Sequence, residues 1–192
     1  MLGIAWNLSW VLPALNLIAF LGALATHRIK KGLVAAIFSM VAIFTAFVVF
    51  WFLVSEVIKN GFLGDQITWF QIAETKIILG FYVDRLTVFL LGLITFVALI
   101  VQIYSFGYMK NEPRFGWFFT VNAFFVAAML ALVLADNLLF LYFAWELVGL
   151  GSYLLIGFWY DRRSAAEAAK KAFITTRIGD VALLIGIIVL FK

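Results

Sequence analysis

One stretch of the chain constrains how all the others are interpreted: Asn137-Leu-Leu-Phe-Leu-Tyr-Phe-Ala-Trp-Glu146-Leu-Val-Gly-Leu-Gly-Ser-Tyr-Leu-Leu-Ile-Gly-Phe-Trp-Tyr160. This run is long enough to cross a bilayer, because roughly 20 residues span ~30 Å of hydrocarbon. Glu146 lies in its middle, about 12 Å along a helix axis from Leu138. An ionised side chain at that depth costs roughly 2.5–3.5 kcal/mol on insertion scales. Glu146 therefore needs a partner, water or a bound proton, and such residues commonly mark an ion or proton path.

The composition of the whole chain indicates an integral membrane protein. Of its 192 residues, 66% are hydrophobic and 12% are charged, and the mean hydropathy is +1.12. A soluble domain usually has about 25% charged residues, so this chain has too few polar side chains to cover a water-soluble globule. It contains no cysteine and one histidine, which excludes disulfides and thiolate metal sites and argues against a histidine-built metal site. We expect no metal site, no cofactor and no nucleic acid bound by this chain, and a lipid bilayer around it.

The apolar runs predict an all-α integral membrane protein with about six transmembrane helices, forming a single transmembrane domain over residues 1–192. The predicted spans are residues 4–25, 33–54, 86–107, 117–135, 138–159 and 172–191. The loop 55–85 is the one sizeable extramembrane segment. Its β-prone stretches 67–72 and 76–83, separated by residues 73–75, predict a short hairpin on the outer surface.

The basic residues predict the orientation of these spans. The loops on one side hold nine of the 14 lysines and arginines, namely Arg28, Lys30, Lys31, Lys110, Arg114, Arg162, Arg163, Lys170 and Lys171. The positive-inside rule places these loops in the cytoplasm and the N-terminus outside, which for a multi-pass bacterial protein means the inner (plasma) membrane. The first basic cluster follows the first span instead of preceding it, so we expect a retained span and not a cleaved signal peptide.

Charged residues inside the predicted spans are the candidate functional residues. On the fifth span, Glu146 shares one helical face with Gly149 and Tyr153. On the sixth span, Arg177 and Asp180 are three residues apart and can pair within one helix. A carboxyl group that is destabilised by burial and stabilised by a nearby cation can bind and release a proton as that cation moves.

Each candidate also has a purely structural interpretation. Glu146 can relay protons, or it can form a fixed ion pair that orients helices. Asp180 can belong to a proton path, or it can simply neutralise Arg177. Arg177 can adjust the proton affinity of the two acids, or it can be present only as half of a neutral pair that allows the helix to insert into the membrane. Lys170 lies seven residues before Arg177 at the mouth of the helix. It is a weak candidate for attracting protons, because snorkelling of its charge to the interface explains it equally well.

Several ordered motifs resemble one protein family. They are Val133-Leu-Ala-Asp-Asn-Leu-Leu139, Trp145-Glu-Leu-Val-Gly149, Lys171-Ala-Phe-Ile-Thr-Thr-Arg-Ile-Gly-Asp180 and, around the third span, Val83-Asp-Arg-Leu-Thr87 and Tyr104-Ser-Phe-Gly-Tyr-Met109. Together they resemble the antiporter-like subunit L of respiratory complex I, NADH–quinone oxidoreductase, which is called chain 5 in mitochondria. The resemblance is close over residues 80–192 and looser before them.

The resemblance implies a proton-translocating subunit of the membrane arm, coupled to quinone reduction elsewhere in the enzyme. The buried glutamate of the family falls on Glu146 and its aspartate on Asp180, with Arg177 beside it. The resemblance places no redox centre in this chain and puts FMN, the iron–sulfur clusters and quinone in partner subunits.

One departure from the family pattern concerns length. Members are considerably longer and are built from inverted repeats, with a buried lysine on a broken helix beyond the sixth span. This chain lacks that segment. We therefore expect an N-terminal portion, or one piece of a split subunit, that needs other membrane-arm subunits and a chain supplying the downstream helices.

Two other functions remain open from the residues and motifs alone. Mrp-type cation/proton antiporters share the buried glutamate, so the chain could belong to a secondary antiporter instead of a redox-driven translocase. Alternatively, both acids could be structural in a non-catalytic membrane scaffold.

Overall fold

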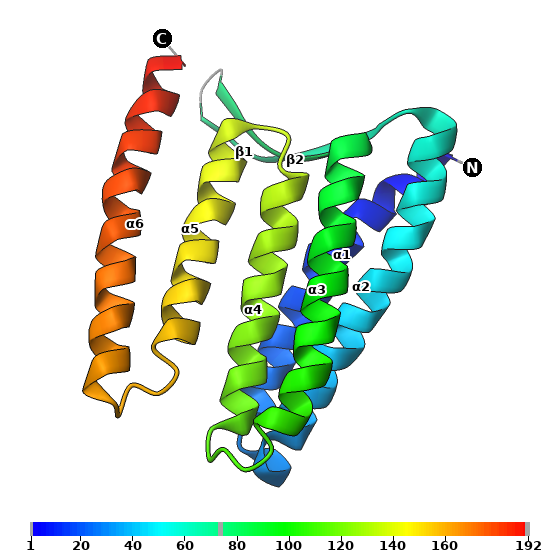
Figure 1. The fold of residues 1–192 in the computed structure, drawn as a ribbon. Coiled ribbons are helices and arrows are strands. Elements are labelled where there is room, and N and C mark those ends of the chain that lie inside the picture. Colours follow the sequence, from blue (N-terminus) through cyan, green and yellow to red (C-terminus); the bar gives the residue numbers. More distant parts are fainter. Residues whose placement is uncertain (1, 73–74, 191–192) are drawn as a thin grey trace.

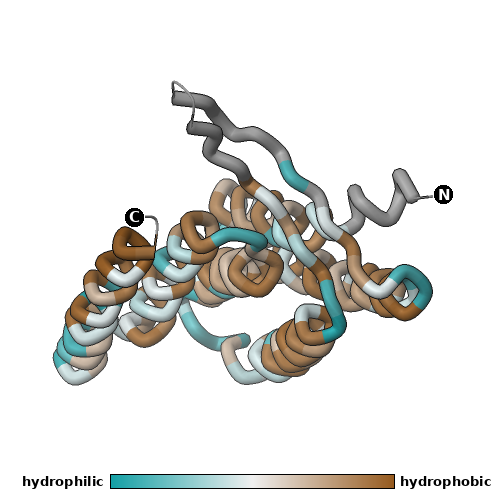
Figure 2. The backbone as a smooth tube through the Cα atoms, turned by 90° about the horizontal axis from the view of Figure 1, so that it is seen from above, coloured by the Kyte–Doolittle hydropathy of each residue, from teal (hydrophilic) through white to brown (hydrophobic). Residues whose placement is uncertain are grey.

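Six long helices stand side by side in the computed structural model, which describes residues 2–72 and 75–190 (Figure 1). The helices, with one short 3-10 helix η1, are α1 Leu2–Thr26, η1 Ile29–Gly32, α2 Leu33–Asn60, α3 Arg85–Tyr108, α4 Phe115–Leu134, α5 Leu138–Ile156 and α6 Arg163–Leu190. All six long helices contain a stretch that is long and apolar enough to cross a membrane. Seen from above, hydrophobic residues dominate them (Figure 2). The predicted membrane fold with six spans is confirmed.

The predicted hairpin is also present. Strands β1 Leu63–Ile72 and β2 Thr75–Val83 pair antiparallel, with a register shift between Thr68 and Phe70. β1 begins four residues earlier than the predicted stretch 67–72, because pairing with β2 continues to the Leu63–Val83 pair at the base of the hairpin. Residues 73–74 of the predicted turn lie outside the described residues.

Three helix ends differ from the predicted spans by three residues or more. Helix α2 continues to Asn60, so the first six residues of the predicted loop 55–85 are helical. Helix α6 begins at Arg163, well before the predicted start at residue 172, because the Ala-rich residues 164–171 favour a helix although they are not apolar enough to count as a span. An exposed ion pair of 2.8 Å between Arg163 Nε and Glu167 Oε1 supports this first turn. Helix α5 ends at Ile156 instead of residue 159, where the backbone N–H of Gly157 donates to the carbonyl of Tyr153.

Side-chain caps fix where two helices begin. The Asp84 carboxylate accepts a hydrogen bond of 2.8 Å from the backbone N–H of Thr87 and starts α3. That bond stabilises the charged carboxylate and lowers the pKa of Asp84 below its usual value. Asn137 caps α5 in the same way, accepting a bond of 2.8 Å from the N–H of Phe140.

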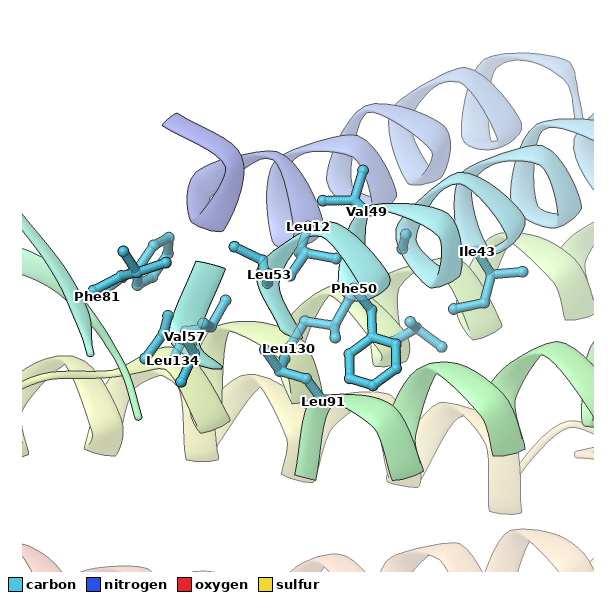
Figure 3. Packing of buried hydrophobic residues seen from close by; sticks show 14 of the residues in the cluster. Leu12, Ile43, Val49, Phe50, Leu53, Val57, Phe81, Leu91, Leu130 and Leu134 are labelled. Carbon is cyan, nitrogen blue, oxygen red and sulfur yellow. The ribbon is translucent and has the colours of Figure 1, made fainter. Parts of the chain in front are cut away.

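The apolar core lies among α1 to α4 and the base of the hairpin. Leu12, Leu53, Leu91 and Leu130, one from each of these four helices, are fully buried and pack in one cluster (Figure 3). The outer pair of helices is different: 56% of the α4 span is buried, against 17% for α5 and 11% for α6. Helix α6 stands at the edge of the row, beyond α5 (Figure 1). It packs against α5 among the described elements.

The three basic loops lie together at one end of the helices, and the hairpin lies at the other end with both termini (Figure 1). This arrangement agrees with the alternation of spans from which the orientation was predicted. At the basic end, the α1–α2 turn touches the start of α4, where Gly32 has a φ of +85° and approaches the backbone of Gly116. A side chain at Gly32 would therefore meet both backbone strain and a steric clash. Which side of the membrane holds the basic end stays a prediction from the positive-inside rule.

Asp136, in the turn between α4 and α5, attaches the hairpin to the helices. Its carboxylate accepts hydrogen bonds from Gln66 Nε2 at 2.7 Å and from Asn137 Nδ2 at 2.6 Å. Its backbone N–H donates to the carbonyl of Gly80 in β2 at 3.1 Å. A Cβ atom added at Gly80 would overlap the Asp136 carboxylate. Only glycine at position 80 lets this carboxylate sit against the strand.

We predict that Gly80→Ala lowers the free energy of unfolding by about 1–3 kcal/mol, because the new methyl group displaces Asp136 and loosens the hairpin. Gly64→Ala is the matched control, since a Cβ at Gly64 in β1 would meet its nearest atoms at 3.8 Å, an ordinary contact. Thermal unfolding in mild detergent measures both. An equal effect of the two substitutions would contradict the proposed role of Asp136.

Candidate functional site

The candidate site lies between α5 and α6. Glu146 of α5 forms an ion pair with Arg177 of α6, through Glu146 Oε2 and Arg177 Nη1. The same guanidinium nitrogen is 3.6 Å from Oδ2 of Asp180, one helical turn further along α6. The structure thus brings three of the predicted residues, Glu146, Arg177 and Asp180, into one cluster. The pairing expected within α6 exists, but it is the looser contact of Arg177.

These three charged groups are shielded to different degrees. The side chain of Asp180 is 6% exposed, that of Glu146 is 23% exposed and that of Arg177 is 32% exposed. Glu146 lies near the middle of the 19-residue helix α5, so at membrane depth little of this exposure leads to bulk water. The cluster is therefore screened weakly, and each charge depends on its neighbours for stabilisation.

Trp145 also belongs to the cluster, although the sequence analysis did not identify it as a candidate. Its indole Nε1 donates a hydrogen bond of 2.7 Å to Oδ1 of Asp180. Asp180 is thus contacted through one oxygen by Trp145 and through the other by Arg177. The available signal was the indole itself, because a Trp N–H held away from water usually finds a hydrogen-bond acceptor.

The Arg177 guanidinium lies close to both helices. A Cβ added at Gly149 of α5 would lie 3.4 Å from Arg177 Nη2, at the short end of ordinary contact. Arg177 Cζ lies 4.5 Å from the ring centroid of Phe173, which in turn packs against Tyr153 with ring centroids 5.1 Å apart. Cation–π contact of this kind stabilises a desolvated guanidinium. The buried Nε of Arg177 has no hydrogen-bond partner among the described residues.

Lys170 is not part of this cluster. It is exposed near the start of α6, two helical turns before Arg177, and it lines a cavity at the basic end of the molecule. The structure therefore places Lys170 at the helix mouth, as the sequence predicted, without contact to Glu146 or Asp180.

The charges of the cluster define what it can do chemically. Two carboxylates share one guanidinium, so with both acids ionised one negative charge is uncompensated within the cluster. An uncompensated charge in a low-dielectric region is costly, and one bound proton removes it. A single bound proton would therefore neutralise the cluster.

Removing individual charges should destabilise the protein in a definite order. We predict that Arg177→Met costs the most, about 3–5 kcal/mol, because it leaves two carboxylates without their cation. The double change Arg177→Met with Asp180→Leu should cost less. Asp180→Leu alone should cost least, because the Glu146–Arg177 pair remains neutral.

Thermal unfolding of the three variants in mild detergent measures this order. The difference between the stability loss of the double variant and the sum of the two single losses gives the coupling energy between Arg177 and Asp180. If Asp180→Leu alone were as damaging as Arg177→Met, Asp180 and not Glu146 would be the main partner of Arg177.

The chain is similar to known membrane-arm proteins in sequence. Residues 69–119 match the family described as NADH-ubiquinone oxidoreductase (complex I), chain 5 N-terminus, and residues 135–192 match the family described as NADH:quinone oxidoreductase/Mrp antiporter, transmembrane. The chain is 36% identical to NAD(P)H-quinone oxidoreductase chain 5 of Synechocystis sp., over 97% of this chain and 28% of the relative. It is 41% identical to F420H2 dehydrogenase subunit L of Methanosarcina mazei, over 95% of this chain and 27% of the relative.

The fold has a solved counterpart in the membrane-bound sulfane sulfur reductase, an archaeal respiratory membrane complex. The TM-score is 0.77 at 18% identity, over 93% of this chain and 36% of that chain, which shows a common fold. The chain spans less than a third of the length of the two sequence relatives. The motifs around Glu146 and Asp180 lie within the second family match. This chain therefore belongs to the antiporter-like family of complex I chain 5, or subunit L, and corresponds to its N-terminal portion.

Proposed function

We propose that this chain is part of a proton-translocating subunit in the membrane arm of a complex I-type oxidoreductase, and that Glu146, Arg177 and Asp180 relay protons within it. The observation that carries this proposal is the sharing of one guanidinium by two carboxylates at mid-membrane depth. A purely structural ion pair needs only one acid to neutralise Arg177. The second acid adds a negative charge that a bound proton would neutralise.

The geometry supports a simple exchange. Arg177 now pairs with Glu146 and lies 3.6 Å from Asp180. A small movement of the guanidinium toward Asp180 would leave Glu146 without its cation, so Glu146 would take up a proton while Asp180, now paired with Arg177, would release one. The return movement would restore the Glu146–Arg177 ion pair, so Glu146 would release its proton and Asp180 would take one up. Trp145 would hold Asp180 in place through both states, because its hydrogen bond does not involve Arg177.

The driving reaction lies outside this chain in the proposed assembly. The relatives include NAD(P)H-quinone oxidoreductases and an F420H2 dehydrogenase, so similar membrane subunits serve different electron donors. We infer that FMN, iron–sulfur clusters and quinone sit in partner subunits, and that further membrane-arm segments supply the helices that follow α6. The inner membrane of a bacterium, with the basic loops in the cytoplasm, is the proposed location.

We predict that Glu146→Gln lowers proton translocation by the intact complex at least about tenfold, because the amide cannot exchange a proton. Glu167→Gln, which removes an exposed carboxylate of α6 paired with Arg163, is the matched control and should leave translocation unchanged. The measurement is acidification or alkalinisation in proteoliposomes during electron transfer, without sodium, for complexes whose subunit composition is checked.

Three outcomes separate the alternatives. Full translocation by Glu146→Gln in an assembled complex would overturn the relay. Failure of that variant to assemble, with Glu167→Gln intact, would favour a scaffold. Dependence of transport on sodium, without any electron transfer, would favour a cation/proton antiporter.

A further inference from the structure

A cavity of about 740 Å³ opens at the basic end of the molecule, away from the charge cluster. Four segments that are distant in sequence line it: the turn after α1, the start of α4, the end of α5 and the start of α6. The cavity thus lies where the helices leave the hydrocarbon and the basic loops begin. Its lining residues do not include Glu146, Arg177 or Asp180, and its assignment does not rest on the proposed function.

The lining of the cavity is basic. His27, Arg28, Arg114 and Lys170 contribute to it, and the described lining residues include no acid. Arg114 is already engaged: it pairs with Asp161, donates to the carbonyl of Phe158 at 3.0 Å and lies 4.0 Å from the ring centroid of Tyr160. Arg114 therefore links the segments that form the cavity wall, and its charge is already paired with Asp161.

Arg28 and Lys170 are in a different situation. Neither forms an ion pair with any residue that the structure describes. They line the cavity from different segments, Arg28 from the turn after α1 and Lys170 from α6. Two cations that face one cavity without an acidic partner make a site for an anion, and phosphate is the anion that such basic pockets between membrane helices commonly take.

The apolar surroundings indicate what carries the phosphate. Trp117, Tyr153 and Leu154 also line the cavity, so its wall suits an amphiphile better than a free ion. Deeper in the membrane, Ile174 and Ile178 follow Lys170 at steps of four residues and are 61% and 71% exposed. This spacing puts them on the same face of α6 as Lys170. An acyl chain extending from the cavity would run along this face.

We propose that the cavity binds the headgroup of an anionic phospholipid, with Arg28 and Lys170 contacting its phosphate and an acyl chain lying on Ile174 and Ile178. Bound there, the lipid fills the gap between the α1–α4 core and the outer helices α5 and α6 at the basic end. It also touches Tyr153, whose ring packs on Phe173 beneath Arg177. The lipid site therefore adjoins the support of the charge cluster.

The test uses the intact complex, purified in mild detergent, depleted of lipid and titrated with phosphatidylglycerol while native mass spectrometry counts bound lipids. The variant is Arg28→Gln with Lys170→Gln. The matched control is Arg162→Gln with Arg163→Gln, which removes two charges from the same end outside the cavity lining. A third variant, Leu154→Trp, narrows the cavity without changing its charge.

The wild type and the control should hold one tightly bound phosphatidylglycerol that the other two variants lose, with binding weakened about tenfold or more by removal of two cations. Equal binding in all four proteins would overturn the proposal, as would the absence of a tight lipid from the wild type. Occupancy by inorganic phosphate that phosphatidylglycerol does not displace would show a free-anion site and overturn the lipid assignment.

Discussion

The cost of an unpaired charge in the bilayer is the constraint on which this structure depends. With no water in the hydrocarbon, each ionised side chain must find its partner within the protein. Glu146 and Arg177 meet this requirement across two helices, and their ion pair joins α5 to α6. Asp180 adds a second acid to the same guanidinium, and Trp145 holds that acid by an independent hydrogen bond. The fold thereby places two acids beside one cation, as the proposed relay requires.

The architecture separates an apolar core from an outer pair of helices. Helices α1 to α4 enclose the apolar cluster shown in Figure 3 and are tied to the hairpin through Asp136. Helices α5 and α6 stand outside this core, and most of the α6 surface is exposed and apolar. In a complete membrane arm, lipid and neighbouring segments would cover that surface. The proposed relay and the proposed lipid site both lie along this outer pair.

Much of the fold could be predicted from local patterns. Apolar runs give the spans, β-prone stretches give the hairpin, and lysine and arginine counts group the basic loops at one end. Helix α6 begins before the predicted span, because hydropathy does not detect the polar, Ala-rich residues 164–171 that extend the helix. The predicted stretch for β1 was too short, because strand pairing, and not hydrophobicity, extends this strand to Leu63.

The candidate site was predictable in its residues but not in its connections. Periodicity places Arg177 and Asp180 on neighbouring positions of one helix, yet it carries no information on how α6 is rotated against α5. That rotation decides that Arg177 pairs with Glu146 and that Trp145 reaches Asp180. The packing that decides it involves both helices, as in the contact of Tyr153 on α5 with Phe173 on α6.

Infrared difference spectroscopy of the intact complex during electron transfer would test the central claim most directly, because the carbonyl stretch of a protonated carboxylic acid is distinct from that of a carboxylate. A relay through Glu146 predicts a carboxylic-acid band that changes during turnover, disappears in Glu146→Gln and persists in Glu167→Gln. The same band, unchanged in Glu146→Gln while electron transfer continues, would show that Glu146 keeps one protonation state and would contradict the proposed relay.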